Sequence, residues 1–299
     1  MRILVTGATG QVGGALAMRL QGLGEVLAAD RSILDLGRPD AIAKILDHLA
    51  PSIIVNAAAY TAVDRAEDEP ALAMAVNAKA PGVIARWAAA RAIPLIHFST
   101  DYVFSGAGER PWREDDEPEP LCVYGATKLA GENEIRAAGG CFLILRTSWV
   151  YAAQGNNFPR TIARLARERK ELRIVADQIG APTSARLLAD AVAGIIAGGP
   201  DHLRQGCSQA GGLVHFAAWG ETSWHGFASA VVDGLRGRGC VLAVERLIPI
   251  SSEEYPTKAK RPHNSRLDLG RWRSVFKQTP PPWQAALAPV LDEMAKLVG

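Results

Sequence analysis

Short apolar runs alternate with longer amphipathic segments through the first half of the chain. The apolar runs are rich in branched residues, as is typical of strands buried on both faces of a parallel sheet, and they lie at 2–6, 26–29, 52–55, 95–98 and 142–145. Between them, apolar residues recur with the spacing of a helix that buries one face. This pattern predicts helices over 11–20, 39–49, 69–90 and 128–136.

The second half is less regular. Helical patterns cover 159–170, 184–196 and 224–235, and residues 213–217 have the pattern of a strand that returns to the main sheet. Residues 247–282 are rich in proline, arginine and lysine, which predicts a segment dominated by loops.

Strands separated by helices predict right-handed βαβ crossovers and therefore an α/β fold. We expect a Rossmann-type doubly wound parallel sheet with a smaller C-terminal substrate-binding domain. The dinucleotide-binding domain is predicted over 1–150, rejoined by a segment around 205–245. Substrate binding is assigned mainly to 151–299, so the boundary is expected to be discontinuous.

Composition narrows the possible partners. The chain has 299 residues, of which 48% are hydrophobic and 21% charged, and its net charge of +2 includes no long basic tract. We therefore expect neither nucleic acid nor a membrane as partner. The four cysteines are widely spaced, and the first strand follows Met1 directly. These features lead us to expect a cytoplasmic protein without a signal peptide, a disulfide framework or a metal site.

A glycine-rich turn connects the first strand to the first helix. Gly7, Gly10 and Gly13 have a spacing that lets the backbone approach a pyrophosphate at a helix N-terminus. Asp30 ends the second strand, where it could accept hydrogen bonds from an adenosine ribose, although the neighbouring Arg31 could meet a 2′-phosphate instead. The choice between NADH and NADPH therefore stays open.

Two residues after a short third strand have two interpretations. Asp35 and the adjacent Leu36 could flank the adenine ring, or Asp35 could be an ordinary turn aspartate.

Tyr124 and Lys128 carry the candidate chemistry. They are four residues apart on a predicted helix, so their side chains face the same way. A nearby ammonium is expected to lower the pKa of the phenol, which could then protonate an alkoxide, while Lys128 could also hold the nicotinamide ribose. Thr100 ends the strand before them, where it could hydrogen-bond the same substrate carbonyl.

Together these residues resemble the extended short-chain dehydrogenase/reductase superfamily, and within it the dTDP-4-dehydrorhamnose reductase family. The resemblance runs from Arg2 to about Trp283 and is carried by the segments 98–104 (FSTDYVF), 124–132 (YGATKLAGE), 146–151 (RTSWVY), 177–183 (DQIGAPT) and 261–265 (RPHNS). It implies reduction of carbon 4 of dTDP-4-dehydro-L-rhamnose to give dTDP-L-rhamnose, with NADPH or NADH as the cofactor.

The resemblance also implies roles for individual residues. Tyr124 would be the proton donor and Lys128 its partner on the nicotinamide ribose. Residues implied in substrate binding are Thr100, Asp101, Trp149, Asn157 and Arg261. Residues implied in lining the cofactor, besides the glycines, Tyr124 and Lys128, are Gln11, Val12, Asp30, Asp35, Leu36, Ala59, Tyr60 and Thr61.

Some of these features have a structural alternative. Trp149 could be a core aromatic that ends its strand. The basic residues around Arg261, namely Lys258, Lys260 and Arg266, could hold the diphosphate of a sugar nucleotide or form a solvated loop. Some members of the family dimerise through a metal held by glutamates, but this chain has Arg186 and Ala15 at the corresponding places. We therefore expect a monomer or a weak homodimer without such a bridge.

Two rival functions share parts of this pattern. A sugar-nucleotide dehydratase or epimerase of this superfamily is the nearer rival, but dehydratases need an added acid beside Thr100 and Asp101, where this chain has Tyr102. A regulatory subunit that binds dinucleotide, as the beta subunit of methionine adenosyltransferase does, is the second. The intact set of Thr100, Tyr124 and Lys128 favours a reductase.

Overall fold

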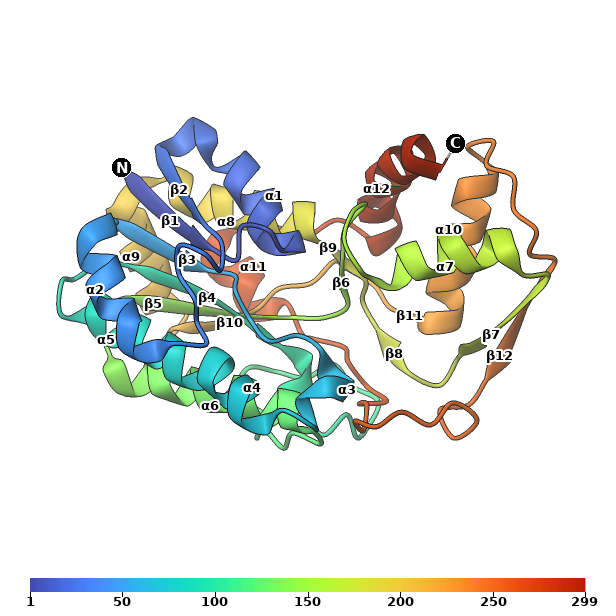
Figure 1. Ribbon diagram of the computed structural model, residues 1–299, viewed down its shortest axis with the longest axis horizontal. Coiled ribbons are helices and arrows are strands. Elements are labelled where there is room, and N and C mark those ends of the chain that lie inside the picture. Colours follow the sequence, from blue (N-terminus) through green and yellow to red (C-terminus); the bar gives the residue numbers. More distant parts are fainter. Residues whose placement is uncertain (299) are drawn as a thin grey trace.

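The computed structural model describes residues 1–298 and is built around one parallel sheet (Figure 1). Its strands are ordered β10-β5-β4-β3-β1-β2, and every neighbouring pair is parallel. Their bounds are Arg2–Thr6 for β1, Glu25–Ala29 for β2, Ile53–Asn56 for β3, Leu95–Thr100 for β4, Phe142–Thr147 for β5 and Leu213–His215 for β10. The predicted Rossmann-type sheet, including the late returning strand, is confirmed.

Helices cover both faces of this sheet because successive side chains of each strand point to opposite sides. Ile3 and Val5 pack with one set of helices, whereas Leu4 packs with the other. The first set consists of α1 (Gln11–Arg19), α8 (Ala185–Ala197), α9 (Gly199–Gln209) and α11 (Gly270–Phe276). The second set includes α2 (Pro39–Leu49), α5 (Ala80–Ala89) and α6 (Val123–Ala138).

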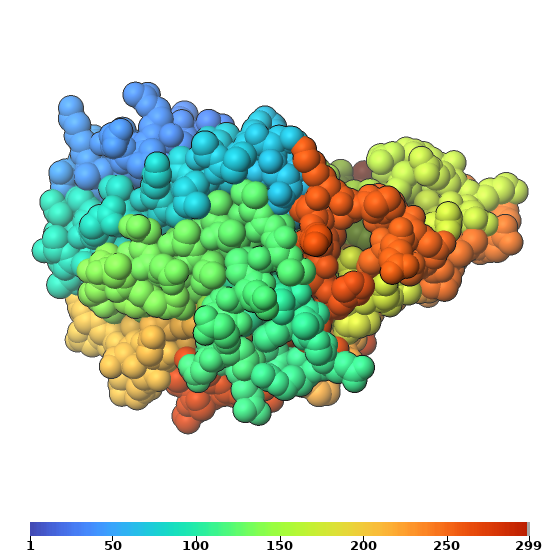
Figure 2. All heavy atoms as spheres, turned by 90° about the horizontal axis from the view of Figure 1, so that it is seen from below, coloured from blue at the N-terminus to red at the C-terminus, as the bar shows by residue number. Residues whose placement is uncertain are grey.

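A smaller lobe lies beside the sheet and has its own apolar core (Figure 1). Its helices are α7 (Phe158–Glu168), α10 (Trp224–Arg236) and α12 (Trp283–Val298), and a parallel pair of strands, β7 (Glu171–Val175) and β12 (Arg246–Ile250), packs with them. We propose a discontinuous boundary in which 185–217 belongs with the large sheet and α10 with the smaller lobe. Figure 2 shows the segment after β12, coloured orange, lying across the junction between the two lobes.

The remaining elements are short. These are η1 (Gln21–Leu23), α3 (Val63–Ala66), α4 (Pro70–Met74), η2 (Ala75–Lys79), η3 (Asp101–Val103), β6 (Val150–Tyr151), β8 (Ile179–Gly180), β9 (Thr183–Ser184) and β11 (Thr222–Ser223). Among residues 1–298, none of the helices combines the length and apolarity needed to traverse a bilayer.

Several boundaries differ from the sequence-based expectation. Helix α6 begins at Val123 rather than 128, because Glu67, from a distant segment, accepts a 2.8 Å hydrogen bond from the Val123 amide. The single helix predicted over 69–90 is interrupted by the π-helical turn η2. The short third strand before Asp35 does not form, because Asp30 holds the chain there in a turn. The segment 247–282 is not all loop, since it contains α11 and most of β12.

Close packing explains two glycines of the first turn. Gly7 has φ of +66°, which a side chain rarely adopts, and an added Cβ there would lie 2.8 Å from the Cα of Ala58. At Gly13, an added Cβ would lie 2.1 Å from the carbonyl oxygen of Gly7. Helix α1 can therefore approach β1 only because position 13 has no side chain.

This packing predicts that Gly13→Ala destabilises the fold by about 2 kcal/mol, because the atom that the new methyl group meets belongs to the backbone and cannot move aside. Gly22→Ala is the control, since an added Cβ at Gly22 meets nothing within 4 Å. Urea unfolding measures both variants. Equal stability of Gly13→Ala and the wild type would contradict the packing argument.

Candidate active site

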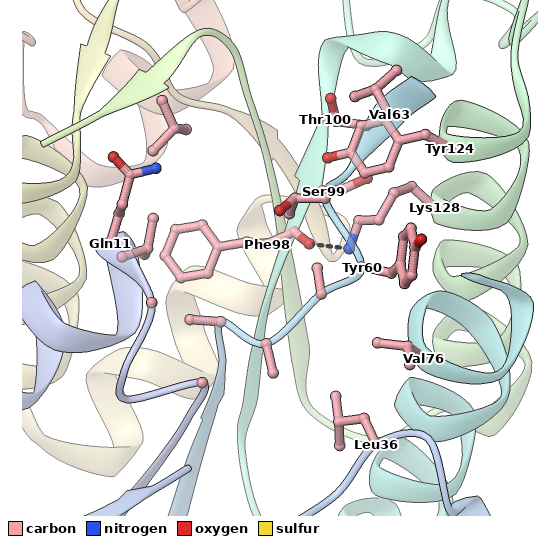
Figure 3. Close-up of a pocket in the computed structure, with 18 of the residues that line it drawn as sticks. Gln11, Leu36, Tyr60, Val63, Val76, Phe98, Ser99, Thr100, Tyr124 and Lys128 are labelled. Atoms are coloured by element: carbon pink, nitrogen blue, oxygen red, sulfur yellow. Dashed lines mark hydrogen bonds between the residues drawn. The ribbon is translucent and has the colours of Figure 1, made fainter. Parts of the chain in front are cut away.

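A cleft of about 760 Å³ runs along the carboxyl ends of β1, β3 and β4. This is the edge of an open parallel sheet where ligands bind. Every site residue predicted from the sequence lines it except Gly13, which lies behind the surface against Gly7. In Figure 3, Leu36 and Val76 lie toward one end of the cleft, and Thr100 and Tyr124 lie toward the other.

The end near β2 offers donors and carboxylates suited to a dinucleotide. No side chain caps the N-terminus of α1 at Gly10, so the amides of the first turn are open to an anion. Asp30 Oδ1 accepts hydrogen bonds from the amide and hydroxyl of Ser32, at 2.8 and 2.6 Å, and these bonds lower the pKa of Asp30. Arg31 is 79% exposed and forms an ion pair with Asp35.

The backbone of Tyr60, which lines the middle of the cleft, is held by a buried asparagine that sequence reasoning missed. Asn77 lies in the π-helical turn and accepts from the Tyr60 amide at 2.8 Å while donating to the Tyr60 carbonyl at 3.1 Å. Gly131 on α6 lets this turn come close, because a Cβ there would lie 2.0 Å from the Asn77 carbonyl oxygen. Because Asn77 and Tyr60 are far apart in the sequence, no local sequence motif predicts their contact.

Thr100, Asp101 and Tyr124 form a polar group at the end of β4. The Thr100 hydroxyl donates to Asp101 Oδ1 at 3.1 Å, and Tyr124 lies beside Thr100 in the cleft (Figure 3). Asp101 is 2% exposed, and its other oxygen has no hydrogen-bond partner within residues 1–298. Burial raises the pKa of Asp101 to about 6.

Lys128 lies below Thr100 and Tyr124 in the view of Figure 3 and is itself buried. Its Nζ donates to the carbonyl of Phe98 at 2.6 Å, the dashed line in Figure 3, and lies 3.0 Å from Nε2 of His97. Because only 2% of the residue is exposed, burial lowers the pKa of Lys128 to about 8.

One electrostatic expectation is wrong. The ammonium of Lys128 was expected to lower the pKa of Tyr124, but burial of the phenol dominates and raises that pKa instead. Tyr124 is therefore protonated at neutral pH, which is the state that a proton donor requires.

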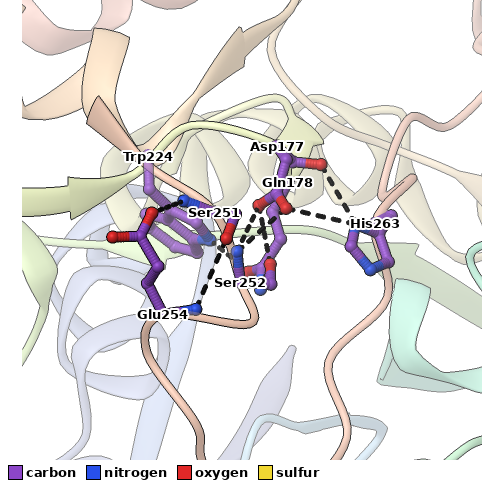
Figure 4. A network of polar contacts seen from close by, with 7 residues as sticks. All are labelled: Asp177, Gln178, Trp224, Ser251, Ser252, Glu254 and His263. Atoms are coloured by element: carbon purple, nitrogen blue, oxygen red, sulfur yellow. Dashed lines mark hydrogen bonds and ion pairs between the residues drawn. The ribbon is translucent and has the colours of Figure 1, made fainter.

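Trp149 forms part of the opposite wall. It adopts a φ of +49°, and its ring stacks on Trp224 with 3.7 Å between centroids and 10° between planes. Trp224 donates to Gln178 at 3.1 Å, and Gln178 donates to Ser252 at 2.9 Å (Figure 4). Trp149 is 9% exposed, so it combines the core role with a position at the cleft surface.

The same network anchors the segment after β12. Asp177 accepts from the amide and the hydroxyl of Ser252, the latter at 2.6 Å, and the ring of His263 lies on the other side of Asp177 (Figure 4). The start of the basic loop is therefore tied to the smaller lobe.

Two implied substrate contacts are engaged with the protein itself. Asn157 caps α7 through the Arg160 amide and donates to Gln11 Oε1 at 2.8 Å, so it bridges the lobes. Arg261 lines the cleft and donates to Asp64 at 2.6 Å and to the Tyr102 hydroxyl at 3.3 Å.

The remaining residues of the predicted basic cluster lie elsewhere. Lys258 pairs with Asp68 and Arg266 with Glu221, and neither Lys260 nor these two residues lines the cleft. Within the described residues, no group of three or more His, Cys, Asp or Glu side chains is placed to hold a metal ion.

The buried carboxyl of Asp101 predicts a pH dependence of stability. Its folded-state pKa lies above the ordinary value of 3.8, so the folded chain retains a proton that the unfolded chain has lost, and stability falls as pH rises through about 6. Asp101→Asn has no carboxyl to ionise at this position, so it does not lose this stability. The unfolding free energy of the variant, relative to that of the wild type, should increase by up to ~3 kcal/mol between pH ~4 and ~7.

Urea unfolding across that range measures the effect. The control is Asp201→Asn, because the side chain of Asp201 is fully exposed. If the unfolding free energies of the wild type and of Asp101→Asn changed with pH in the same way, ionisation of the Asp101 carboxyl would not destabilise the fold, and the prediction would be wrong.

Comparisons with known proteins show the family to which the chain belongs. The family model of the RmlD substrate binding domain matches residues 1–296. Reductases of dTDP-4-dehydrorhamnose from Shigella flexneri and Burkholderia thailandensis are 44% and 46% identical to the chain, over 98% and 96% of its length and 98% and 97% of theirs.

Solved structures agree as well. The dTDP-4-dehydrorhamnose reductase from Clostridium acetobutylicum superposes with a TM-score of 0.89 at 35% identity, covering 98% of this chain and 99% of that one. The Bacillus anthracis enzyme, solved in complex with NADP, gives 0.88 at 32% identity with the same coverage. The chain therefore belongs to the dTDP-4-dehydrorhamnose reductase family.

Proposed function

We propose that this protein reduces the 4-keto group of dTDP-4-dehydro-L-rhamnose to give dTDP-L-rhamnose, with NADPH or NADH as reductant. The observation that carries the proposal is the convergence of Thr100, Tyr124 and Lys128 at the end of β4, in the same cleft as the glycine turn. A dinucleotide fits the far end of the cleft, where the uncapped α1 and Asp30 provide the matching donors and acceptor. When bound there, the nicotinamide supplies the hydride.

The residues of the chain handle the proton. Burial raises the pKa of Tyr124, so the phenol is protonated, and it lies beside Thr100 in the cleft, where both hydroxyls can meet the oxygen of a substrate carbonyl (Figure 3). As that oxygen gains charge, the phenol gives it a proton and the carbonyl becomes an alcohol. Lys128 is held by Phe98 with its amine at the cleft surface, where it can hold the nicotinamide ribose and support the phenolate that remains.

The side chain next to Asp101 favours reduction of the substrate over its dehydration. Tyr102 occupies that position, where a dehydratase would need an added acid such as a carboxyl group. A regulatory role is disfavoured because the proton-donating residues are intact and face the cleft.

The proposal predicts that Tyr124→Phe lowers kcat ~10²-fold or more while leaving cofactor affinity nearly intact, because only the proton donor is lost. Absorbance at the reduced nicotinamide band, with substrate generated in situ, measures turnover, and cofactor fluorescence measures binding. Lys128→Met is the companion variant and should damage both.

Parallel assays with NADPH and NADH give the cofactor preference. An unchanged kcat in Tyr124→Phe would refute the role of the phenol. Dinucleotide binding without turnover by the wild type would favour the regulatory alternative or another keto sugar.

We also propose that the chain works in the cytoplasm as a monomer or weak homodimer without a metal bridge. Arg186 supports the absence of a metal bridge. It lies 4.0 Å from Glu293 of the same chain, and it brings a positive charge to a position where a bridging metal would need a carboxylate ligand. Analytical ultracentrifugation should give the same mass with and without a chelator. A dimer that dissociates only in the chelator would overturn the proposal.

A further inference from the structure

A row of buried polar side chains crosses the sheet beneath the active site. Thr6 is paired with Asn56 in the register of β1 and β3, and Asn56 is paired with His97 in the register of β3 and β4. All three are 1% exposed and lie level with one another on the face that α6 covers. Lys128, on α6, meets the last of them.

These side chains are linked by short hydrogen bonds. Thr6 Oγ1 donates to Asn56 Oδ1 at 2.6 Å, Asn56 Nδ2 lies 2.9 Å from His97 Nδ1, and Nε2 of the same ring lies 3.0 Å from Lys128 Nζ. The other end of the row is the backbone amide of Ala58, which donates to Thr6 Oγ1 at 3.1 Å.

A backbone amide can only donate, so it sets the direction of the whole row. Thr6 accepts from Ala58 and passes its single hydrogen to Asn56 Oδ1. The amide nitrogen of Asn56 therefore faces His97 and donates to Nδ1. Rotating the Asn56 amide by half a turn would leave the buried Thr6 hydroxyl hydrogen without its acceptor, which is unfavourable inside the protein.

A neutral imidazole that accepts at Nδ1 carries its proton on Nε2. We propose that His97 is a positioning residue for Lys128, held by Ala58, Thr6 and Asn56 in the tautomer whose Nε2–H donates to the lysine amine. The amine then directs one hydrogen to the Phe98 carbonyl and keeps the other for the cleft.

This arrangement favours the neutral amine of Lys128. An ammonium carries only N–H donors, so it could not accept the hydrogen bond from the Nε2–H of His97. The groups facing the pair from other elements do not remove this bias. Glu132, one turn further along α6, favours the ammonium but accepts two hydrogen bonds from the buried Arg146 of β5, at 2.8 and 2.7 Å. Asp101 and Tyr124 are titratable groups in the same cleft: Asp101 accepts a hydrogen bond from the Thr100 hydroxyl, and Tyr124 is kept protonated by its raised pKa.

The burial of His97 agrees with a neutral ring. Burial and the nearby Lys128 lower the pKa of His97 well below its ordinary value, so the ring does not take up a second proton at neutral pH. The row thus keeps Lys128 close to the point at which it can accept and return a proton. Its meaning for catalysis rests on the proposed function, where Lys128 supports the phenolate of Tyr124.

The first test is the tautomer itself. Nitrogen NMR of histidine-labelled protein, with His97→Gln to assign the signal among the six histidines, should show a proton on Nε2 and none on Nδ1. The signal should not titrate between pH ~5 and ~8. A proton on Nδ1, or an imidazolium in that range, would overturn the proposal.

The second test breaks the row three links away from the lysine. Thr6→Val removes the hydroxyl at nearly constant shape, frees the Asn56 amide to rotate and lets the imidazole proton move to Nδ1. The pKa of Lys128, followed by carbon NMR of labelled lysine and assigned with Lys128→Met, should then rise by about one pH unit, the equivalent of one hydrogen bond.

Thr6→Ser keeps the hydroxyl and is the matched control, so it should leave the Lys128 titration where it is. Unchanged titration in Thr6→Val would overturn the proposal. Both readouts are made without substrate, so their failure counts against this inference alone. Loss of keto-sugar turnover with an intact NMR signature would count against the proposed function instead.

Discussion

The burial of the Lys128 amine is the constraint that the rest of the site follows. An amine removed from water needs hydrogen-bond partners inside the protein, because a buried polar group without one costs stability. The Phe98 carbonyl and the His97 ring lie on β4, so the amine ties α6 to that strand at the point where Thr100 and Asp101 emerge. The position of Tyr124, one turn earlier on α6, follows from that tie.

A second buried contact holds the same helix one turn further along the chain. Glu132 is fully buried and forms a two-pronged ion pair with Arg146 of β5, while Ser99 of β4 donates to it at 2.6 Å. Breaking such a pair would leave an uncompensated charge, so alternative positions of α6 along the sheet are costly. The two contacts together define the register of α6, and catalytic geometry depends on that register more than on the flexible ends of side chains.

The parts of the fold that depend on short-range sequence patterns could be predicted. Branched apolar runs predicted each strand of the large sheet, and the glycine spacing predicted the turn at Gly7, because both signals are local. The start of α6 could not be predicted in this way, since its amide is capped by Glu67, far away in the chain. The same holds for Asn77 and His97, whose partners lie on other strands and helices.

Electrostatics was the least accessible property from sequence. The i,i+4 spacing correctly placed Tyr124 and Lys128 in one cleft, but it could not reveal that burial outweighs the lysine charge at the phenol. The burial of Lys128 comes from Phe98 and His97, and that of Asp101 from the cover of the segment containing Ser265. Charge states at this site are thus properties of the assembled fold. Gln11 and Asn157 join the lobes on one side of the cleft, and Asp64 and Arg261 join them on the other. Because Gln11, Asn157 and Arg261 also line the cleft, the contacts that join the lobes help to set the shape of the site in which these charge states arise.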